Sequence, residues 1–442
     1  MVELFELLFE LSKATDLVSP KLNHHQHQVG FIACCLGEQL GYSKEQLNTL
    51  GMAGILHDIG GLSLQERLNV LKFDAVHPHH HARIGWQLLK ENTNLTEIAE
   101  IIKFHHVDWH NGQGLFFEGE TVPLDSHLIH LADRIATSLD ANKKLINQAD
   151  QIVKKISSAS ERKFNPVFVE AFSQISRYDY FWFDLESIMK GNNLYRKFSD
   201  FSKIQIDLDG LLDISRLFSR IIDFRSPFTA VHSVGVAVVG SEIGRLCGLD
   251  KDTCQKIKIA GYLHDLGKLA VPNELLEKPA RLTDEEFAMV KAHVYETFIL
   301  LDRVSGMEEI NAIASLHHEK LDGSGYPFKL TAKQLNTEAR ILAIADIFTA
   351  LTENRPYRKG MNKDAVKTIF EELKRDYKLD PVILKLVDDN YQELEGIRIS
   401  AQTSARLHYQ RLKREMDEIS CQIEPDFGRS LWPDIRLCQH PE

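Results

Sequence analysis

The stretch "GYLHDLGKLAVP", residues 261–272, places an adjacent histidine and aspartate inside an apolar segment and follows them with a lysine. A similar stretch, "GMAGILHDIGGLS" at residues 51–63, occurs earlier in the chain, with glycine in place of that lysine, Lys268. Imidazole and carboxylate groups are ligands for divalent metals. Adjacent residues point about 100° apart on a helix, so His264 could hold one ion while Asp265 bridges two. The paired stretches therefore predict a metal site and a duplicated domain.

Further matches extend the repeat in both directions. With His27 placed over His232, "HQVGFIACCLGEQLG" lies over "HSVGVAVVGSEIGRL", and the two His-Asp pairs then coincide. The steps between matched positions are 30, 24, 24 and 28 residues in the first copy and 32, 29, 24 and 29 in the second, which indicates two copies of one domain. The matched positions are His27, His57, Asp58, His81, His105, His106 and Asp133 in the first copy, and His232, His264, Asp265, His293, His317, His318 and Asp346 in the second.

Apolar residues recur at helical spacing along most of the chain, and strict alternation is rare. We therefore predict an all-α protein made of two tandem helical-bundle domains. Histidines and carboxylates on several helices can converge in the core of such a bundle. The first domain is expected over residues 1–195, the second over 206–400 and a C-terminal helix and tail over 401–442, with the junction around 189–210.

Composition limits the class of protein. The chain has 442 residues, 43% of them apolar, and a formal net charge of −11, which argues against binding to polymeric nucleic acid. It lacks a run of roughly 20 apolar residues of the kind that crosses a bilayer, and the N-terminal stretch reads as an amphipathic helix, so we expect a cytoplasmic protein without membrane contacts. The six cysteines show no CxxC spacing and are expected to be reduced and mostly buried.

The second copy resembles the HD-GYP branch of the HD phosphohydrolase superfamily over roughly residues 210–400. The motifs that carry the resemblance occur in the family's order: His232, "HDLGK" at 264–268, His293, "HHEKLDGSGYP" at 317–327, Asp346 and "RPYR" at 355–358. The resemblance implies two HD-type domains, of which the second is a metal-dependent phosphodiesterase of cyclic dinucleotides.

The resemblance also implies a ligand set for two divalent ions, iron or manganese. One ion would be held by His232, His264, Asp265 and Asp346, and the other by Asp265, His293, His317 and His318. Some relatives bind a third ion through a glutamate four residues before the first histidine. That position is Phe228 here, so two ions are expected.

Four residues are implied in catalysis or substrate binding beside the ligands. Lys268 would neutralise phosphate charge or assist the leaving 3′-oxygen, and Asp265 and Lys268 together are the predicted catalytic pair. Tyr326 of "GYP" and Arg355 and Arg358 of "RPYR" would hold the second phosphate and the bases. Many relatives have aspartate at the position of Thr349, which bears on substrate contacts there.

The first copy resembles the wider HD superfamily and keeps every expected ligand type, which makes it a candidate further metal site. Gly61 replaces the lysine, "VDWHNGQGLFF" replaces the Tyr-Pro loop, and no RPYR equivalent follows. Three interpretations remain open: a structural partner of the second copy, a metal-binding or ligand-sensing regulator, and a second hydrolase. A 5′-nucleotidase would fit the last, because the linear product of ring opening carries a terminal 5′-phosphate.

The function implied is hydrolysis of 3′,3′-cGAMP, c-di-GMP or both to a linear 5′-phosphorylated dinucleotide. The tandem HD and HD-GYP arrangement resembles bacterial enzymes that act on the mixed ring, which favours 3′,3′-cGAMP. Alternatives are a c-di-GMP-specific enzyme with a structural or regulatory first domain, a non-catalytic HD signalling scaffold, and a nucleoside-triphosphate hydrolase. A signalling scaffold is disfavoured because both copies retain the ligands, and "GYP" and "RPYR" argue against triphosphate hydrolysis.

Overall fold

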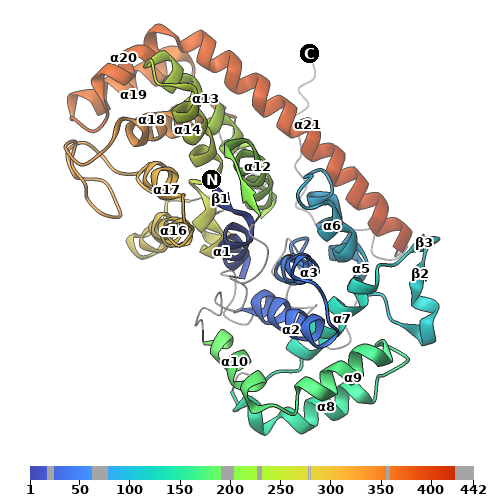
Figure 1. Ribbon diagram of the computed structural model, residues 1–442. Helices are drawn as coiled ribbons and strands as arrows, with labels where there is room; N and C mark the ends of the chain where they lie inside the picture. The colour runs from blue at the N-terminus through green and yellow to red at the C-terminus, as the bar shows by residue number, and fades with distance from the viewer. Residues whose placement is uncertain are drawn as a thin grey trace. The chain divides into compact units, whose positions relative to one another are not determined.

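The computed structural model describes residues 1–16, 24–61, 78–140, 142–190, 204–225, 231–276, 278, 280–354 and 359–423. Over these residues the chain is almost entirely helical, which confirms the all-α prediction; the strands described form two short antiparallel ribbons. The chain divides into an N-terminal unit, residues 1–207 with 303–306, and a C-terminal unit, residues 208–302 with the chain from 307 onward (Figure 1).

The N-terminal unit is built around helix α2, which is buried from His25 to Gly37 and packs on α3, α7, α9 and α10. The strand β1 pairs with β4, placing Val2 opposite Ile206, and β2 pairs with β3. The elements are β1 (Val2–Glu3), α1 (Leu4–Asp16), α2 (His25–Gln39), α3 (Lys44–Leu56), α5 (Pro78–Leu89), α6 (Thr96–Lys103), η2 (His110–Leu115), β2 (Phe116–Phe117), β3 (Glu120–Thr121), α7 (Leu124–Ala136), η3 (Leu145–Asn147), α8 (Ala149–Ser157), α9 (Pro166–Ile175), α10 (Asp179–Met189) and β4 (Gln205–Ile206).

The C-terminal unit is built in the same way around α13, which packs on α14, α18 and the long helix α21 (Figure 1). Helix α12 packs on α14, and α16 packs on the short turn η4 and on α17. The elements are α12 (Leu208–Arg225), α13 (His232–Leu246), α14 (Lys251–Leu263), η4 (Leu266–Ala270), α15 (Asn273–Leu276), α16 (Asp284–Asp302), α17 (Glu308–Ala314), α18 (Thr337–Thr352), α19 (Lys363–Arg375), α20 (Pro381–Asp389) and α21 (Tyr391–Ile423).

Equivalent helices lead into the two His-Asp pairs, and each begins at a side-chain cap. Ser43 caps α3 by accepting from the backbone N–H of Gln46, and Asp250 caps α14 by accepting from that of Thr253. Each cap satisfies an amide that has no partner within its helix and so fixes where the helix starts. Both caps lie 14 residues before the histidine of their pair, so the helices end at the same point.

Small residues let these helices cross their neighbours at close range. A Cβ on Gly54 of α3 would lie 2.5 Å from Cα of Gly30 on α2, and a Cβ on Gly261 of α14 would lie 2.6 Å from Cα of Ala237 on α13. Such distances are shorter than side chains tolerate, so glycine is required at both crossings. The crossing fixes how far along each helix pair the following His-Asp pair lies.

The observed units differ in detail from the expected domain limits. Residue 206, the expected start of the second domain, lies in β4, which pairs with β1 of the N-terminal unit. Residue 400, its expected end, lies inside α21, which runs unbroken from Tyr391 to Ile423. Most of the expected junction at 189–210 lies outside the described residues. Helix α21 is thus shared between the expected second domain and the expected C-terminal segment.

Two expectations from composition concern described residues. Within that part of the chain, no helix combines the length and the apolar character that a bilayer crossing requires. The cysteines whose side chains are described are free thiols; Cys34, Cys35 and Cys254 are buried and Cys247 is half-buried.

Candidate metal centres

The C-terminal unit brings all seven predicted ligands together. They come from the first residue of α13, the end of α14, the middle of α16, the segment after α17 and the middle of α18. Nitrogen and oxygen atoms within 4.8 Å of one another form three overlapping groups: His232, His264 and Asp346; His264, Asp265 and His317; and His293, His317 and His318. His264 and His317 each belong to two groups, so the cluster is continuous.

The His-Asp pair lies at the end of α14, which corrects the expectation that both residues continue the helix. The helix ends at Leu263; His264 is its C-cap, and Asp265 leaves the helical conformation at the start of η4. His264 Nδ1 donates to the carbonyl oxygen of Gly261 at 2.8 Å. This bond uses one of the carbonyls that a helix end leaves without a backbone partner. The turn after it lets both side chains face the cluster.

Three histidines present an open nitrogen to the cluster. His264, His293 and His317 each donate from Nδ1 to a carbonyl oxygen three residues earlier, at 2.8, 2.5 and 2.6 Å. Nε2 is therefore the atom with the free lone pair, and Nε2 of His293 and of His317 is buried with no hydrogen-bond partner. Burial lowers the pKa of His293 to about 3 and that of His317 well below its usual range. Neutral imidazoles with an unpaired inward nitrogen fit metal coordination.

Asp265 uses its two oxygens on different partners. Oδ1 faces Nε2 of His293 at 3.5 Å, whereas Oδ2 faces Nε2 of His264 at 3.3 Å and Nζ of Lys268 at 2.5 Å. Burial alone would raise the pKa of Asp265, but the charges of His264 and Lys268 hold it well below its usual range. The group is therefore a carboxylate whose oxygens point to two sides of the cluster, as a bridging ligand requires.

His232 is held differently from the other histidines. Its Nε2 lies 3.0 Å from Oδ1 of Asp346, and its Nδ1 lies 3.1 Å from both carboxylate oxygens of Glu353. Burial alone would lower the pKa of His232, but the Glu353 and Asp346 carboxylates raise it to about 10. Sequence reasoning missed Glu353. The available signal was its place seven residues after Asp346, two turns along the same helix face.

A tightly anchored loop carries Tyr326. The buried carboxylate of Glu319 accepts from the backbone N–H groups of Phe328, Lys329 and Leu330 at 2.7, 3.1 and 3.0 Å. A Cβ on Gly325 would collide with the backbone of Glu319, so the loop closes only with glycine there. The Tyr326 ring consequently lies 4.9 Å from the His318 ring.

The other predicted substrate residues are placed as follows. Lys268, with its side chain 22% exposed, lies beside Asp265. Arg355 and Arg358 lie outside the described residues, as does Phe228. Thr349 is fully buried one turn beyond Asp346. Sequence reasoning missed Lys291 of α16, whose Nζ lies 5.9 Å from the centre of the Tyr326 ring.

The N-terminal unit gathers a similar cluster. Asp58, His81, His105 and His106 offer ligand atoms within 4.8 Å of one another, and Asp58 also belongs to a group with His25 and His57. Asp133 joins them, with Oδ1 3.4 Å from Nε2 of His25. The ligand atoms Nε2 of His25 and of His57 and Oδ1 of Asp58 and of Asp133 are buried without a hydrogen-bond partner. Unpaired donors and acceptors of this kind fit a metal ion, which would satisfy them together.

The first ligand of this cluster is His25, and His27 lies apart from it. Nε2 of His27 contacts Oγ of Ser12 at 3.0 Å and the carbonyl oxygen of Phe9 at 3.1 Å, and its ring stacks on that of Phe9. Residues two apart on a helix point about 200° apart, so only one of the two histidines can face the cluster. The shared letters "HxVG" placed His27 over His232 and misled the alignment.

The helix crossing gives the correct register. Because Gly54 and Gly261 both lie three residues before their histidines, Gly30 of α2 corresponds to Ala237 of α13. Each lies five residues after the start of its helix, so His25 corresponds to His232. The step to the His-Asp pair is then 32 residues in both copies, and the two-residue discrepancy disappears.

A buried arginine distinguishes the N-terminal cluster. Arg134 donates to Oδ2 of Asp133 at 2.5 Å from Nη2 and 3.1 Å from Nε, and it is 2% exposed. The corresponding residue beside Asp346 is Ile347. Burial alone would raise the pKa of Asp133, but Arg134 and the nearby histidines hold it below its usual range. One oxygen of Asp133 is thus engaged by a cation of the protein itself.

Comparison with known proteins agrees with this repeated geometry. The HD-domain family matches residues 23–138 and again residues 216–383. The chain is 32% identical over 425 residues to the 3′3′-cGAMP-specific phosphodiesterase 3 of Vibrio cholerae, covering 84% of this chain and 90% of that protein. This chain belongs to the HD-GYP family of cyclic-dinucleotide phosphodiesterases.

Two further comparisons extend over most of this HD-GYP protein. It is 27% identical over 409 residues to the 3′3′-cGAMP-specific phosphodiesterase 1 of Vibrio cholerae, covering 90% of this chain and 94% of that one. A solved structure of a cyclic GMP-AMP-specific phosphodiesterase of Vibrio cholerae matches with a TM-score of 0.60 and 23% identity over 88% of this chain and 98% of that one. The solved structure supports the all-helical fold.

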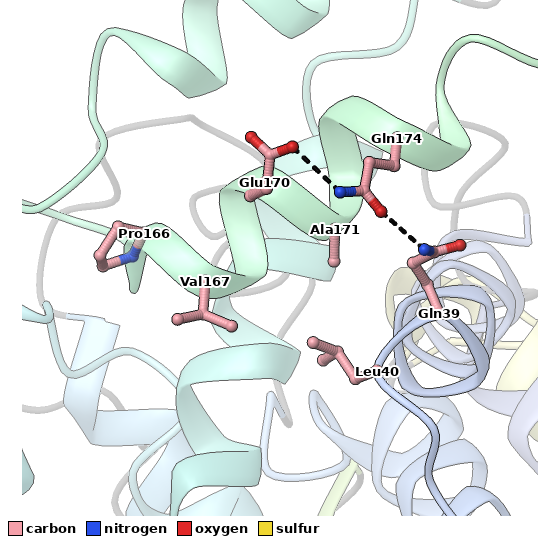
Figure 2. Close-up of a pocket in the computed structure, with 7 residues that line it drawn as sticks. All are labelled: Gln39, Leu40, Pro166, Val167, Glu170, Ala171 and Gln174. Atoms are coloured by element: carbon pink, nitrogen blue, oxygen red, sulfur yellow. Dashed lines mark hydrogen bonds between the residues drawn. The ribbon is translucent and has the colours of Figure 1, made fainter.

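A surface hollow of about 400 Å³ between α2 and α9 is separate from the N-terminal cluster. Figure 2 shows its polar side chains satisfying one another: Gln39 donates to Gln174 at 2.7 Å, and Gln174 donates to Glu170 at 3.0 Å. Gln39 and His25 lie at opposite ends of α2, about 21 Å apart along the helix axis. This hollow of the HD-GYP protein therefore takes no part in metal binding.

Proposed function

We propose that the C-terminal unit is a metal-dependent phosphodiesterase that opens 3′,3′-cGAMP, c-di-GMP or both to a linear dinucleotide with a 5′-phosphate. The observation that carries the proposal is the geometry of Asp265, whose two oxygens face histidines on two sides of one cluster. The names of the two Vibrio cholerae relatives favour 3′,3′-cGAMP as the substrate.

The ligand sets proposed for this unit divide the cluster into two overlapping halves. His232, His264, Asp265 and Asp346 would hold one ion, and Asp265, His293, His317 and His318 would hold the other. Mixed imidazole and carboxylate donors suit iron or manganese. A bound pair of divalent ions supplies an activated water molecule and offsets charge on the phosphoryl oxygens.

Residues of the chain itself supply the remaining chemistry. The water oxygen bonds to phosphorus, the bond from phosphorus to the 3′-oxygen breaks, and a proton passes to that oxygen. Lys268 is partly exposed beside Asp265, where its ammonium group can donate to a phosphate oxygen or to the leaving 3′-oxygen. Tyr326 beside His318 presents a ring on which a base can stack. Arg355 and Arg358 would hold the second phosphate.

Mass analysis of the products tests this proposal. Manganese-loaded protein is incubated separately with 3′,3′-cGAMP and with c-di-GMP, and the expected product is the linear 5′-phosphorylated dinucleotide. Asp265→Asn should abolish turnover, whereas Asp252→Asn, the same change at an exposed position of α14, should leave it unchanged. Failure of the unchanged protein to cleave either ring would refute the proposal and support a signalling scaffold. Release of triphosphate from nucleotides, without ring cleavage, would support the triphosphate hydrolase.

The unpaired atoms of the N-terminal cluster favour a second candidate function. We infer that this unit also holds divalent metal and removes the terminal 5′-phosphate of the linear product. The ligands would be His25, His57, Asp58, His81, His105, His106 and Asp133, because His27 lies apart from them. If the inference is correct, unchanged protein releases phosphate from the linear dinucleotide, and Asp58→Asn stops this step while leaving ring opening intact. Accumulation of phosphorylated product by the unchanged protein would support a structural or regulatory role.

A further inference from the structure

A second pocket of the C-terminal unit lies outside the metal cluster. It has a volume of about 360 Å³ and opens between α12, α13, α14 and α21. None of its lining residues is among the ligands proposed above. The lining residues with chemistry to offer are Arg216, Ser219, Arg220, Lys258, Tyr262 and Tyr409.

Positive charge dominates this pocket. Two arginines of α12, Arg216 and Arg220, and Lys258 of α14 line it, and no lining residue is acidic. Arg216 also forms an ion pair with Asp213 at 3.2 Å, but both side chains are largely exposed, so this pair stabilises little. Burial, and then the charge of Arg216, lower the pKa of Lys258. An anion in the pocket would relieve the repulsion between these cations.

Polar and aromatic groups complete the lining. The hydroxyl of Ser219 is buried and makes no hydrogen bond with the described residues, so a ligand acceptor could satisfy it. Tyr262 and Tyr409 are buried at 5% and 8% exposure and provide ring surface. The guanidinium of Arg216 lies 6.0 Å from the centre of the Tyr262 ring. Cations and a hydroxyl thus accompany aromatic rings, a combination that suits a phosphate joined to a planar base.

We propose that this pocket binds a nucleoside monophosphate. Arg216, Arg220, Lys258 and Ser219 would donate to the phosphate oxygens, and Tyr262 and Tyr409 would contact the base. The volume lies near the lower end of the range of about 300–1,000 Å³ that is usual for small-molecule sites. One nucleotide therefore matches the volume better than a cyclic dinucleotide does.

Calorimetric titration of full-length protein tests the proposal. AMP and GMP are titrated into chelator-treated protein, whose folding is checked by circular dichroism, so that the metal clusters do not contribute. We expect one saturable site per chain, and weaker binding of adenosine, guanosine and inorganic phosphate by at least about tenfold. The titration is repeated on metal-loaded protein carrying Asp58→Asn and Asp265→Asn, which covers the case in which chelation unfolds the chain.

Three variants distinguish this pocket from any other site. Lys258→Gln should weaken binding by about tenfold or more, because it removes a charge-assisted hydrogen bond. Lys251→Gln, the same change at an exposed position on the same helix, should leave binding unchanged. Ser404→Phe, at an exposed residue of the pocket lining, should fill the pocket and block binding. Absence of nucleotide binding to the unchanged protein, or equal binding to all three variants, would overturn the proposal. Inorganic phosphate binding as tightly as AMP would overturn the base contact.

Discussion

His232 and Glu353 form a buried pair in which the histidine Nδ1 lies 3.1 Å from both carboxylate oxygens. The opposite nitrogen, Nε2, faces Asp346 in the proposed metal cluster. A carboxylate behind a ligating imidazole fixes its orientation and makes the coordinating nitrogen more basic. Glu353 is therefore proposed as a positioning residue for His232, at the point where α18 ends.

Removing this carboxylate should weaken metal binding. Glu353→Ala is expected to lower the affinity for manganese by about 10- to 100-fold, because His232 loses its orienting partner. Glu353→Gln, which can still accept from Nδ1, should lose less. Metal affinity is measured by competition with a chelating dye, and Glu372→Gln on the exposed face of α19 is the control. Unchanged affinity in Glu353→Ala would show that His232 is held by other contacts.

Helix α21 should be required for a stable catalytic unit. Gln402 donates from Nε2 to the carbonyl oxygen of Val231 at 3.0 Å and to Glu353 at 3.3 Å, and Arg398 donates to Gln402 at 2.5 Å. Gln402→Leu leaves the Val231 carbonyl and the Glu353 carboxylate without this buried donor, so we expect a loss of about 1–3 kcal/mol in the free energy of unfolding. Urea denaturation measures it.

A shortened chain tests the same helix more severely. Ending the chain after residue 400 removes Gln402 and the buried side chains of Tyr409 and Leu412. The C-terminal unit should then unfold at lower urea concentration than in the Gln402→Leu variant. A truncated protein as stable as the full chain would contradict the role given to α21.

Alanine should have opposite effects at two helical glycines. Gly54→Ala places a methyl group 2.5 Å from Cα of Gly30, so the helices must separate, and a loss of about 1–3 kcal/mol in unfolding free energy is expected. Gly396→Ala of α21 meets no atom within 4 Å and should instead stabilise by about 0.5–1 kcal/mol, because glycine is a poor helix former. Thermal unfolding monitored by circular dichroism compares the two. A gain in stability for Gly54→Ala would argue against the close crossing.

The two histidines at the start of α2 should separate metal binding from stability. His25→Ala should reduce the metal content of the N-terminal unit, measured by elemental analysis in an Asp265→Asn background. His27→Ala should leave metal content unchanged and lower the unfolding temperature, because it removes the contacts with Ser12 and Phe9. Loss of metal in His27→Ala but not in His25→Ala would restore the alignment based on sequence.

Much of the candidate site was predictable from the sequence. Ligand types recur in the same order in both copies, and helical periodicity indicated a bundle in which they could converge. All seven ligands expected in the second copy lie in one cluster. In the first copy six of the seven expected residues join the cluster, and His27 does not.

The remaining features depended on contacts between residues far apart in the chain. Two histidines near one helix start are equally good ligands by residue type, and only the close approach of α3 to α2 at Gly54 and Gly30 decides which one faces inward. Glu353 lies 121 residues from the histidine that it orients. The sequence alone determined residue chemistry and local helix limits, because these depend on near neighbours. The tertiary structure decided register, orientation and partners, because these follow from how helices distant in sequence pack together.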